Sequence, residues 1–172
     1  MPEISRLASL HIVLVETTHP GNIGSAARAL KTMGLSSLRL VAPKVFPNVE
    51  ATALASGAAD LLAQAQVYAT LDEAIADADL VIATSARQRR IPWPCISARE
   101  LGAVLQKEPA EHRIAILFGR EDRGLTNDEL QRCNLHVTIP SNPEYGVLNM
   151  AAAVQVICYE LRMALIGEQV AT

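Results

Sequence analysis

Apolar residues along the chain fall into two patterns, short β-branched runs and longer stripes with helical spacing. The runs are typical of strands covered on both faces, and the stripes are typical of helices that pack on a sheet. We predict strands at residues 10–15, 37–41, 80–83, 113–118 and 136–139. We predict helices at 26–33, 49–65 with an interruption at Ser56 and Gly57, 70–78, 97–106, after Thr126, and 149–166. The alternation predicts an α/β fold, a mostly parallel sheet with helices on both faces, in a single domain over residues 1–172.

The last two predicted strands each end in a loop shaped by glycine or proline, Gly119–Leu125 and Pro140–Asn149. Ligands of open α/β sheets bind outside the carboxyl ends of the strands, so these loops predict the active site. The two glycines of the first loop permit backbone shapes that other residues resist. Glu121 in this loop is an acid, a salt-bridge partner for Arg28 or a hydrogen-bond anchor, and we favour the anchor.

The first predicted strand leads into a turn at residues 20–22 and a helix whose first turn holds Gly24 and Ser25. The unpaired N–H groups at such a helix start make it a candidate anion site. Asn22 alone is better explained as a simple N-cap. Arg28 lies about two turns into the helix, on a face that can look back toward the loop. Taken alone, it is more often an exposed helix arginine than a catalytic one.

Residues 84–94 combine small side chains with a basic, aromatic segment. The small residues are Thr84, Ser85 and Ala86, which end a strand and would let a flat ligand approach the backbone. A tight turn explains them equally well. The next segment holds three arginines and the single tryptophan of the chain, Arg87, Arg89, Arg90 and Trp93. These side chains suit phosphate contacts and base stacking in single-stranded nucleic acid, and a solvated arginine loop with the indole against the core is an equal alternative.

Composition restricts the class of protein. With 172 residues, 50% of them hydrophobic, the chain suffices for one well-buried domain and is too short for two. A net charge of −3 disfavours a protein that coats nucleic acid through bulk charge, and we expect no DNA partner. Cys95, Cys133 and Cys158 lack metal-ligand spacing and predict free thiols without a metal site. Without a membrane-length apolar stretch or a basic and apolar leader, we expect a cytoplasmic protein with no membrane partner.

Motifs exclude several enzyme classes and then point to one family. The sequence has no P-loop, no Gly-x-Gly-x-x-Gly fingerprint and no Gly-x-Ser-x-Gly elbow, which disfavours kinases, nicotinamide dehydrogenases and α/β-hydrolases. Three segments in order resemble the SpoU/TrmH family of SPOUT RNA ribose methyltransferases: Pro20–Arg28, Leu117–Thr126 and Ile139–Asn149. The resemblance spans almost the whole chain and is closest to the bacterial TrmJ branch of that family.

The resemblance implies a cofactor, an assembly and a set of site residues. It implies S-adenosylmethionine as cofactor and a homodimer with a C-terminal trefoil knot, which no pattern argument would propose. The implied cofactor pocket, built largely from backbone groups, comprises Thr84, Ser85, Ala86, Gly119, Ile139, Gly146, Val147 and Leu148. The implied catalytic positions are Asn22, Arg28, Glu121 and Asn149, with Arg28 acting on cofactor held mainly by the other subunit. The implied RNA-binding residues, besides Arg28, are Arg87, Arg89, Arg90, Trp93, Arg120 and Arg123.

The implied reaction is methyl transfer from S-adenosylmethionine to an RNA ribose 2′-hydroxyl, with cytidine or uridine 32 of the tRNA anticodon loop as the expected substrate. Arg28 would stabilise the developing alkoxide. Val147 replaces a serine that many relatives carry. The alternatives are a non-catalytic RNA-binding protein with the same fold, a methyltransferase of ribosomal RNA and an enzyme that uses another nucleotide. Relatives often carry a C-terminal extension that grips tRNA, and we expect it to be absent here.

Overall fold

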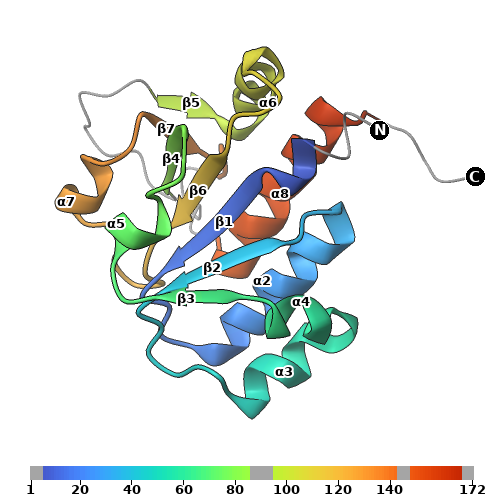
Figure 1. The fold of residues 1–172 in the computed structure, drawn as a ribbon, viewed down its shortest axis with the longest axis vertical. Coiled ribbons are helices and arrows are strands. Elements are labelled where there is room, and N and C mark those ends of the chain that lie inside the picture. The colour runs from blue at the N-terminus through green and yellow to red at the C-terminus, as the bar shows by residue number, and fades with distance from the viewer. Residues whose placement is uncertain (1–5, 86–94, 143–147, 168–172) are drawn as a thin grey trace, which may run out of the picture.

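The computed structural model of the chain describes residues 6–85, 95–142 and 148–167. Within these residues, seven strands form one sheet: β1 (Leu10–Val15), β2 (Ser37–Val41), β3 (Gln66–Tyr68), β4 (Leu80–Ser85), β5 (Cys95–Ser97), β6 (Ile114–Phe118) and β7 (Leu135–Thr138). Their order is β3-β2-β1-β6-β4-β7-β5, and neighbouring strands are parallel (Figure 1). The predicted α/β class and mostly parallel sheet are confirmed.

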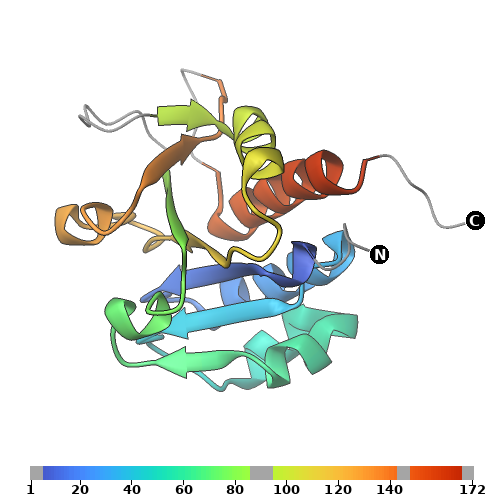
Figure 2. The same cartoon turned by 45° about the horizontal axis from the view of Figure 1, so that its top comes forward.

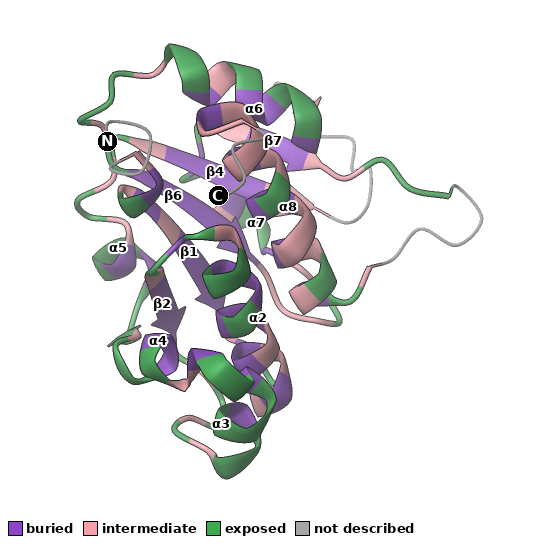
Figure 3. Cartoon of the chain, turned by 90° about the vertical axis from the view of Figure 1, so that its right-hand side faces the viewer, coloured by how far each residue is buried: buried purple, intermediate pink, exposed green. Residues whose placement is uncertain are grey.

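Helices cover the two faces of the sheet unequally. They are α2 (Pro20–Met33), α3 (Val49–Ala55), α4 (Ala59–Ala63), α5 (Leu71–Ala74), α6 (Ala98–Lys107), α7 (Asn127–Leu130) and α8 (Met150–Leu165), with the 3-10 turn η1 (Ser56–Ala58). Five of them, α2, α3, α4, α6 and α8, share the larger core with strand residues such as Ile12 and Leu14 (Figures 1 and 2). The intervening residues Val13 and Val15 face a smaller core under α5 and α7. Helices on both faces are therefore confirmed, and the strands between them are buried (Figure 3).

The prediction missed two strands, β3 and β5, which are the edge strands of the sheet. Each has three residues, and their side chains are exposed or half-buried. A segment of that length is too short to show an alternating pattern, and an edge position does not require an apolar run. The predicted break near Ser56 is confirmed, because α3 ends there and η1 separates it from α4.

The start of α2 differs from the prediction. The helix begins at Pro20, so residues 20–22 form its first turn rather than a separate turn, and His19 rather than Asn22 is the N-cap. Proline suits this position because its missing N–H would have no partner within the helix. Gly24 is required by packing, since a Cβ there would lie 2.0 Å from the Ala51 carbonyl oxygen in α3.

Helix caps largely follow the sequence. Ser97 and Thr126 each form a capping box with the glutamate three residues later. Thr70 caps α5 through the Glu73 N–H, but its hydroxyl rather than its backbone N–H binds the Glu73 carboxylate. Asn149 is the N-cap of α8 rather than its first residue. The three cysteines are free thiols, as predicted. No helix of the described residues has the length and apolar character needed to cross a membrane.

Candidate active site

The carboxyl ends of β6, β4 and β7 lie side by side and bring predicted cofactor residues together. Thr84 and Ser85 end β4. Gly119 and Ile139 directly follow β6 and β7. The Thr84 hydroxyl donates to the Leu117 carbonyl oxygen at 2.7 Å, so it links β4 to β6 within the sheet. A ligand here would meet mainly backbone groups and small side chains.

Side chains from the three sequence motifs form one hydrogen-bonded chain. The Asn149 Nδ2 donates to the Asn22 Oδ1 at 3.3 Å, and the Asn22 Nδ2 donates to the Glu121 Oε2 at 3.0 Å. Asn149 also holds the start of α8, because its Oδ1 accepts from the Ala151 N–H at 2.8 Å. We call Asn149, Asn22 and Glu121 the motif chain. It joins the first turn of α2, the loop after β6 and the cap of α8, which are far apart in sequence.

Glu121 occupies the start of α2. Its two carboxylate oxygens accept from the Thr18 and His19 N–H groups, each at 2.9 Å, in addition to Asn22. Burial opposes the negative charge, but these hydrogen bonds outweigh it and hold the pKa of the Glu121 carboxyl below its ordinary value. The anion at this helix start is therefore a carboxylate of the chain itself. The anchor role of Glu121 is confirmed, and within the described residues it forms no ion pair with Arg28.

Arg28 lies on the exposed side of α2, in the third turn. Among the described residues it has no hydrogen-bond or ion-pair partner. The helix that carries it is held against α8, where the Gln155 amide donates to the Thr32 hydroxyl at 3.1 Å. The Arg162 guanidinium donates to the Met33 carbonyl oxygen at 3.0 Å. A fixed helix thus presents the Arg28 guanidinium to solvent, where it can meet a phosphate or a developing negative charge.

Comparison with known proteins then decides the family. The sequence matches the SpoU rRNA Methylase family over residues 9–159. The chain belongs to this family. It is 56% identical over 163 residues to the tRNA (cytidine/uridine-2′-O-)-methyltransferase TrmJ of Salmonella typhimurium, covering 95% of this chain and 67% of that protein. The predicted resemblance to the SpoU/TrmH family and its TrmJ branch is confirmed.

Two solved structures share the fold of this SpoU-family chain. A probable methyltransferase from Bordetella pertussis Tohama I has a TM-score of 0.89 and 40% identity, covering 95% of this chain and 99% of that one. TrmJ from Z. mobilis ZM4 has a TM-score of 0.86 and 39% identity, covering 94% of this chain and 72% of that one. The chain thus spans about two thirds of the length of the S. typhimurium relative, 67%, and 72% of the Z. mobilis chain.

The SpoU-family loop after β6 is closed on itself. Arg120 and Gly124 exchange backbone hydrogen bonds of 3.2 and 2.8 Å. Gly124 has a φ of +71°, which favours glycine. A Cβ on Gly119 would lie 2.2 Å from the carbonyl carbon of Gly124, so that position excludes any side chain. Gly124 is needed for its backbone angle, as predicted, whereas Gly119 is needed for close approach rather than for a backbone shape.

Arg120 was expected to contact RNA, but its guanidinium binds carboxylates of the chain itself. Its guanidinium lies between the carboxylates of Glu16 and Glu129, and 16% of its side chain is exposed. Because these carboxylates use its N–H groups, we leave Arg120 out of the RNA surface. The sequence analysis did not identify Glu16 and Glu129 as partners of Arg120. The position of Glu16, an acid directly after the apolar strand β1, was the feature that could have indicated its role. Arg123, in contrast, has an 82% exposed side chain, 3.6 Å from Asp122.

Several predicted site residues lie outside the described part of the chain. They are Ala86, Gly146 and Val147 of the cofactor pocket, and Arg87, Arg89, Arg90 and Trp93 of the RNA surface. The trefoil knot depends on the chain path through residues 143–147, so it stays a prediction. Leu148, also predicted for the pocket, is half-buried and directly precedes the cap of α8.

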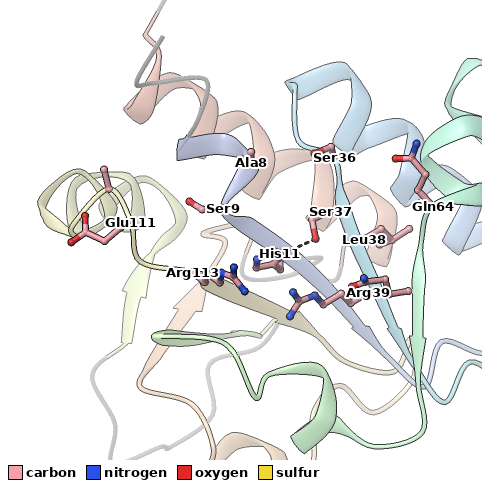
Figure 4. Close-up of a pocket in the computed structure, with 12 residues that line it drawn as sticks. Ala8, Ser9, His11, Ser36, Ser37, Leu38, Arg39, Gln64, Glu111 and Arg113 are labelled. Atoms are coloured by element: carbon pink, nitrogen blue, oxygen red, sulfur yellow. Dashed lines mark hydrogen bonds between the residues drawn. The ribbon is translucent and has the colours of Figure 1, made fainter.

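A groove of about 520 Å³ lies near the amino ends of the strands, opposite the candidate site (Figure 4). We call the side of the sheet where the parallel strands begin its amino edge and the side where they end its carboxyl edge. Arg39 and Arg113 point into this region, but both bind the Asp77 carboxylate, with N–O distances of 2.8 to 3.0 Å. Burial and these guanidinium groups lower the pKa of His11, which borders the groove, to about 4. No described residue of the three motifs lines the groove, so we do not assign it to the SpoU-family site.

Proposed function

We propose that this chain is an S-adenosylmethionine-dependent methyltransferase that modifies a ribose 2′-hydroxyl in tRNA. The observation that carries the proposal is the motif chain, which joins the three motifs at the carboxyl edge of the sheet. The 56% identity to S. typhimurium TrmJ supports tRNA as the substrate and cytidine or uridine as the nucleotide. On the TrmJ resemblance we propose position 32 of the anticodon loop, in a cytoplasmic enzyme.

The ends of β4, β6 and β7 fit the proposed cofactor. Ser85 and Gly119 are small enough for a flat base to approach the backbone, and half-buried Ile139 and Leu148 offer apolar contacts. We assign the pocket to Thr84, Ser85, Ala86, Gly119, Ile139, Gly146, Val147 and Leu148. When bound, S-adenosylmethionine supplies an electrophilic methyl group and becomes a neutral thioether.

Arg28 meets the harder part of the reaction, which is to make an alcohol nucleophilic near neutral pH. Negative charge that develops on the ribose oxygen needs a nearby cation or a base. A guanidinium keeps its proton, so Arg28 acts through its charge and its N–H donors rather than as a base. Its exposure on α2 also allows it to bind a neighbouring phosphate.

Asn22, Glu121 and Asn149 act as positioning residues in this proposal. Their side chains bind one another and the backbone at the starts of α2 and α8. This arrangement fixes the helix that carries Arg28 relative to the cofactor loop. Holding reacting groups in place can supply much of a rate enhancement, because the entropy of alignment is lost before the reaction begins.

We further propose a homodimer in which Arg28 of one subunit acts at the cofactor of the other. The lack of a partner for Arg28 within the described residues supports this arrangement. Beside α2, helix α8 is apolar around much of its surface, and its Tyr159 is 47% exposed. These two helices therefore offer a surface for the second subunit.

The RNA surface combines the exposed arginines with the segment before β5. Its proposed members are Arg28, Arg87, Arg89, Arg90, Trp93 and Arg123. A local basic surface can coexist with a net charge of −3. RNA affinity should therefore fall steeply as salt rises, because bound phosphates release counterions.

The deciding experiment is transfer of labelled methyl from S-adenosylmethionine to tRNA that lacks native modification, with ribosomal RNA in parallel. Label at the ribose of a tRNA nucleotide supports the proposal, and mapping then tests position 32. Label in ribosomal RNA alone contradicts the proposed substrate. Cofactor binding without transfer to either RNA would favour a non-catalytic RNA-binding protein, for which Val147 in place of the family serine is the relevant feature.

A further inference from the structure

The side chain of Arg120 bridges two carboxylates, that of Glu16 directly after β1 and that of Glu129 in α7. Its Nη1 and Nη2 donate to the two carboxylate oxygens of Glu129 at 2.9 and 3.1 Å, and Nη2 also donates to Glu16. The Nη1 further donates to the Gly124 carbonyl oxygen at 3.3 Å. Only 16% of the Arg120 side chain and 12% of the Glu129 side chain are exposed. We call Arg120, Glu16 and Glu129 the Arg120 bridge.

Glu16 reaches the Arg120 bridge from a strained backbone. It directly follows β1 and has a φ of +52°. For a residue other than glycine this conformation is strained, and it persists where surrounding contacts hold it. The Glu16 N–H donates to the Val41 carbonyl oxygen at 2.8 Å, and Lys44 lies 3.5 Å from its carboxylate. The charged contacts of Glu16 therefore help to hold it in this conformation.

The Arg120 bridge and the motif chain hold the same loop through two adjacent residues. Arg120 reaches toward α7 and the end of β1, whereas the next residue, Glu121, reaches toward the start of α2. Gly119, directly before them, belongs to the proposed cofactor pocket. A shift of the Arg120 bridge would therefore move both Gly119 in the proposed cofactor pocket and Glu121, which holds the start of the helix that carries Arg28.

We propose that Arg120 and Glu16 are positioning residues for methyl transfer, which hold Gly119 and Glu121 in the geometry that the reaction requires. This inference rests on the methyltransferase function proposed above. A buried ion pair contributes little net stability, because the cost of desolvation offsets the attraction between its charges. The planar guanidinium does give direction, since its paired N–H groups match the two oxygens of one carboxylate.

The test compares three variants of the full chain with a matched control. Arg120→Met removes the charge, Arg120→Lys keeps the charge without the paired geometry, and Glu16→Gln keeps the shape without the charge. Arg132→Met is the control. Arg132 follows α7, its side chain is 43% exposed, and among the described residues it binds the Asp72 carboxylate and the Asp128 carbonyl oxygen rather than residues 119–125. For each protein we would measure kcat and KM with unmodified tRNA, and amide hydrogen exchange in residues 119–125.

We expect Arg120→Met and Glu16→Gln to lower kcat at least about tenfold and to change the KM for tRNA less than about twofold, because misplaced groups slow the chemical step. Arg120→Lys should fall between these variants and the wild type, and Arg132→Met should match the wild type. Amide exchange in residues 119–125 should be faster in Arg120→Met and Glu16→Gln than in the wild type. A folded Arg120→Met protein with wild-type kcat, or one with a raised KM alone, overturns the proposal.

Two further outcomes are also decisive. If Arg120→Met does not fold, Arg120→Lys and Glu16→Gln are judged by the same criteria. If the wild type transfers methyl to no RNA, the proposed function fails, and amide exchange decides the positioning role by itself. Unchanged exchange in residues 119–125 of Glu16→Gln then overturns that role, and faster exchange supports it.

Discussion

Each of the two edges of the sheet carries arginines paired with carboxylates, but one set fixes a loop of the proposed active site and the other ties strands to a connecting segment. At the carboxyl edge, Arg120 fixes a loop whose next residue, Glu121, belongs to the motif chain. At the amino edge, Arg39 and Arg113 share the carboxylate of Asp77, which ties β2 and β6 to the segment after α5. Sequence motifs meet only at the carboxyl edge of the described sheet. A buried ion pair is therefore no sign of a functional site unless it holds a loop on which residues from separate motifs converge.

The largest effect that this comparison predicts is on activity at the carboxyl edge. Arg28→Ala should lower kcat/KM for tRNA about 100-fold or more, as expected for loss of a donor to a developing oxyanion. Because Arg28 is exposed, its removal should leave the denaturation midpoint unchanged. Single-turnover methyl transfer and urea denaturation would measure the two quantities.

A matched control is Arg99→Ala, which removes an arginine from another helix surface. The Arg99 side chain is 87% exposed and lies 3.7 Å from Glu160. The Arg99→Ala protein should keep wild-type activity and stability, since an ion pair with an exposed arginine contributes about 0–1 kcal/mol to the free energy of unfolding. Equal losses in Arg28→Ala and Arg99→Ala would show that surface charge in general, and not the position of Arg28, supports the reaction.

At the amino edge the prediction is reversed. Asp77→Ala leaves the 6% exposed Arg39 without its carboxylate, and the free energy of unfolding should fall by about 2–3 kcal/mol. Methyl transfer measured well below the unfolding midpoint should be unchanged, because among the described residues Asp77 hydrogen-bonds to Arg39 and Arg113 and to no motif residue. A loss of kcat in the folded variant would break the distinction between the two edges.

The motif chain should show an intermediate effect on both quantities. Glu121→Gln replaces one acceptor oxygen by an NH₂ group and removes the charge that faces the Thr18 and His19 N–H groups. We expect stability to fall by about 1–2 kcal/mol and kcat by about tenfold. Thermal denaturation and steady-state kinetics would measure them. Full activity at reduced stability would assign Glu121 to folding alone.

The sequence predicted the interior of this fold better than its borders. The buried strands β1, β2, β4, β6 and β7 were predicted because each carries an apolar run long enough to recognise. The edge strands β3 and β5 carry no such run. The start of α2 was misplaced because Pro20 and Gly21 favour turns as well as helix starts, and only the packing of the helix decides between them.

The site was predicted as a set of residues but not as a network. Motif resemblance named Asn22, Glu121 and Asn149, yet nothing in a linear sequence indicates that they bind one another. The ion pairs of Arg120 were missed for a related reason. Glu16 lies 104 residues from its partner, and a single arginine in a loop is as consistent with a phosphate contact as with a bridge.

The smallest predicted effect separates the two edges by pH. Burial and the guanidinium groups of Arg39 and Arg113 lower the pKa of His11 to about 4, whereas in the unfolded chain it is near 6.5. The unfolded state therefore binds more protons, and stability should be lost as pH falls from 6.5 toward 4. Because His11 is partly exposed, we expect its share to be about 1 kcal/mol.

Carboxylates at both edges should respond in a lower window, because Arg39 and Arg113 also lower the pKa of Asp77 at the amino edge. The pKa of Glu121 lies below its ordinary value of 4.5, so its stabilising charge is present above that pH and is lost only below it. Buried His136, whose pKa is also lowered by burial, adds to the slope as pH falls below its ordinary value of 6.5. His11→Gln should therefore flatten part of the stability profile between pH 6.5 and 4.5 and leave the decline below pH 4 unchanged. Urea denaturation across this range would test the assignment, and an unaltered profile in the variant would show that His11 does not link the amino edge to pH.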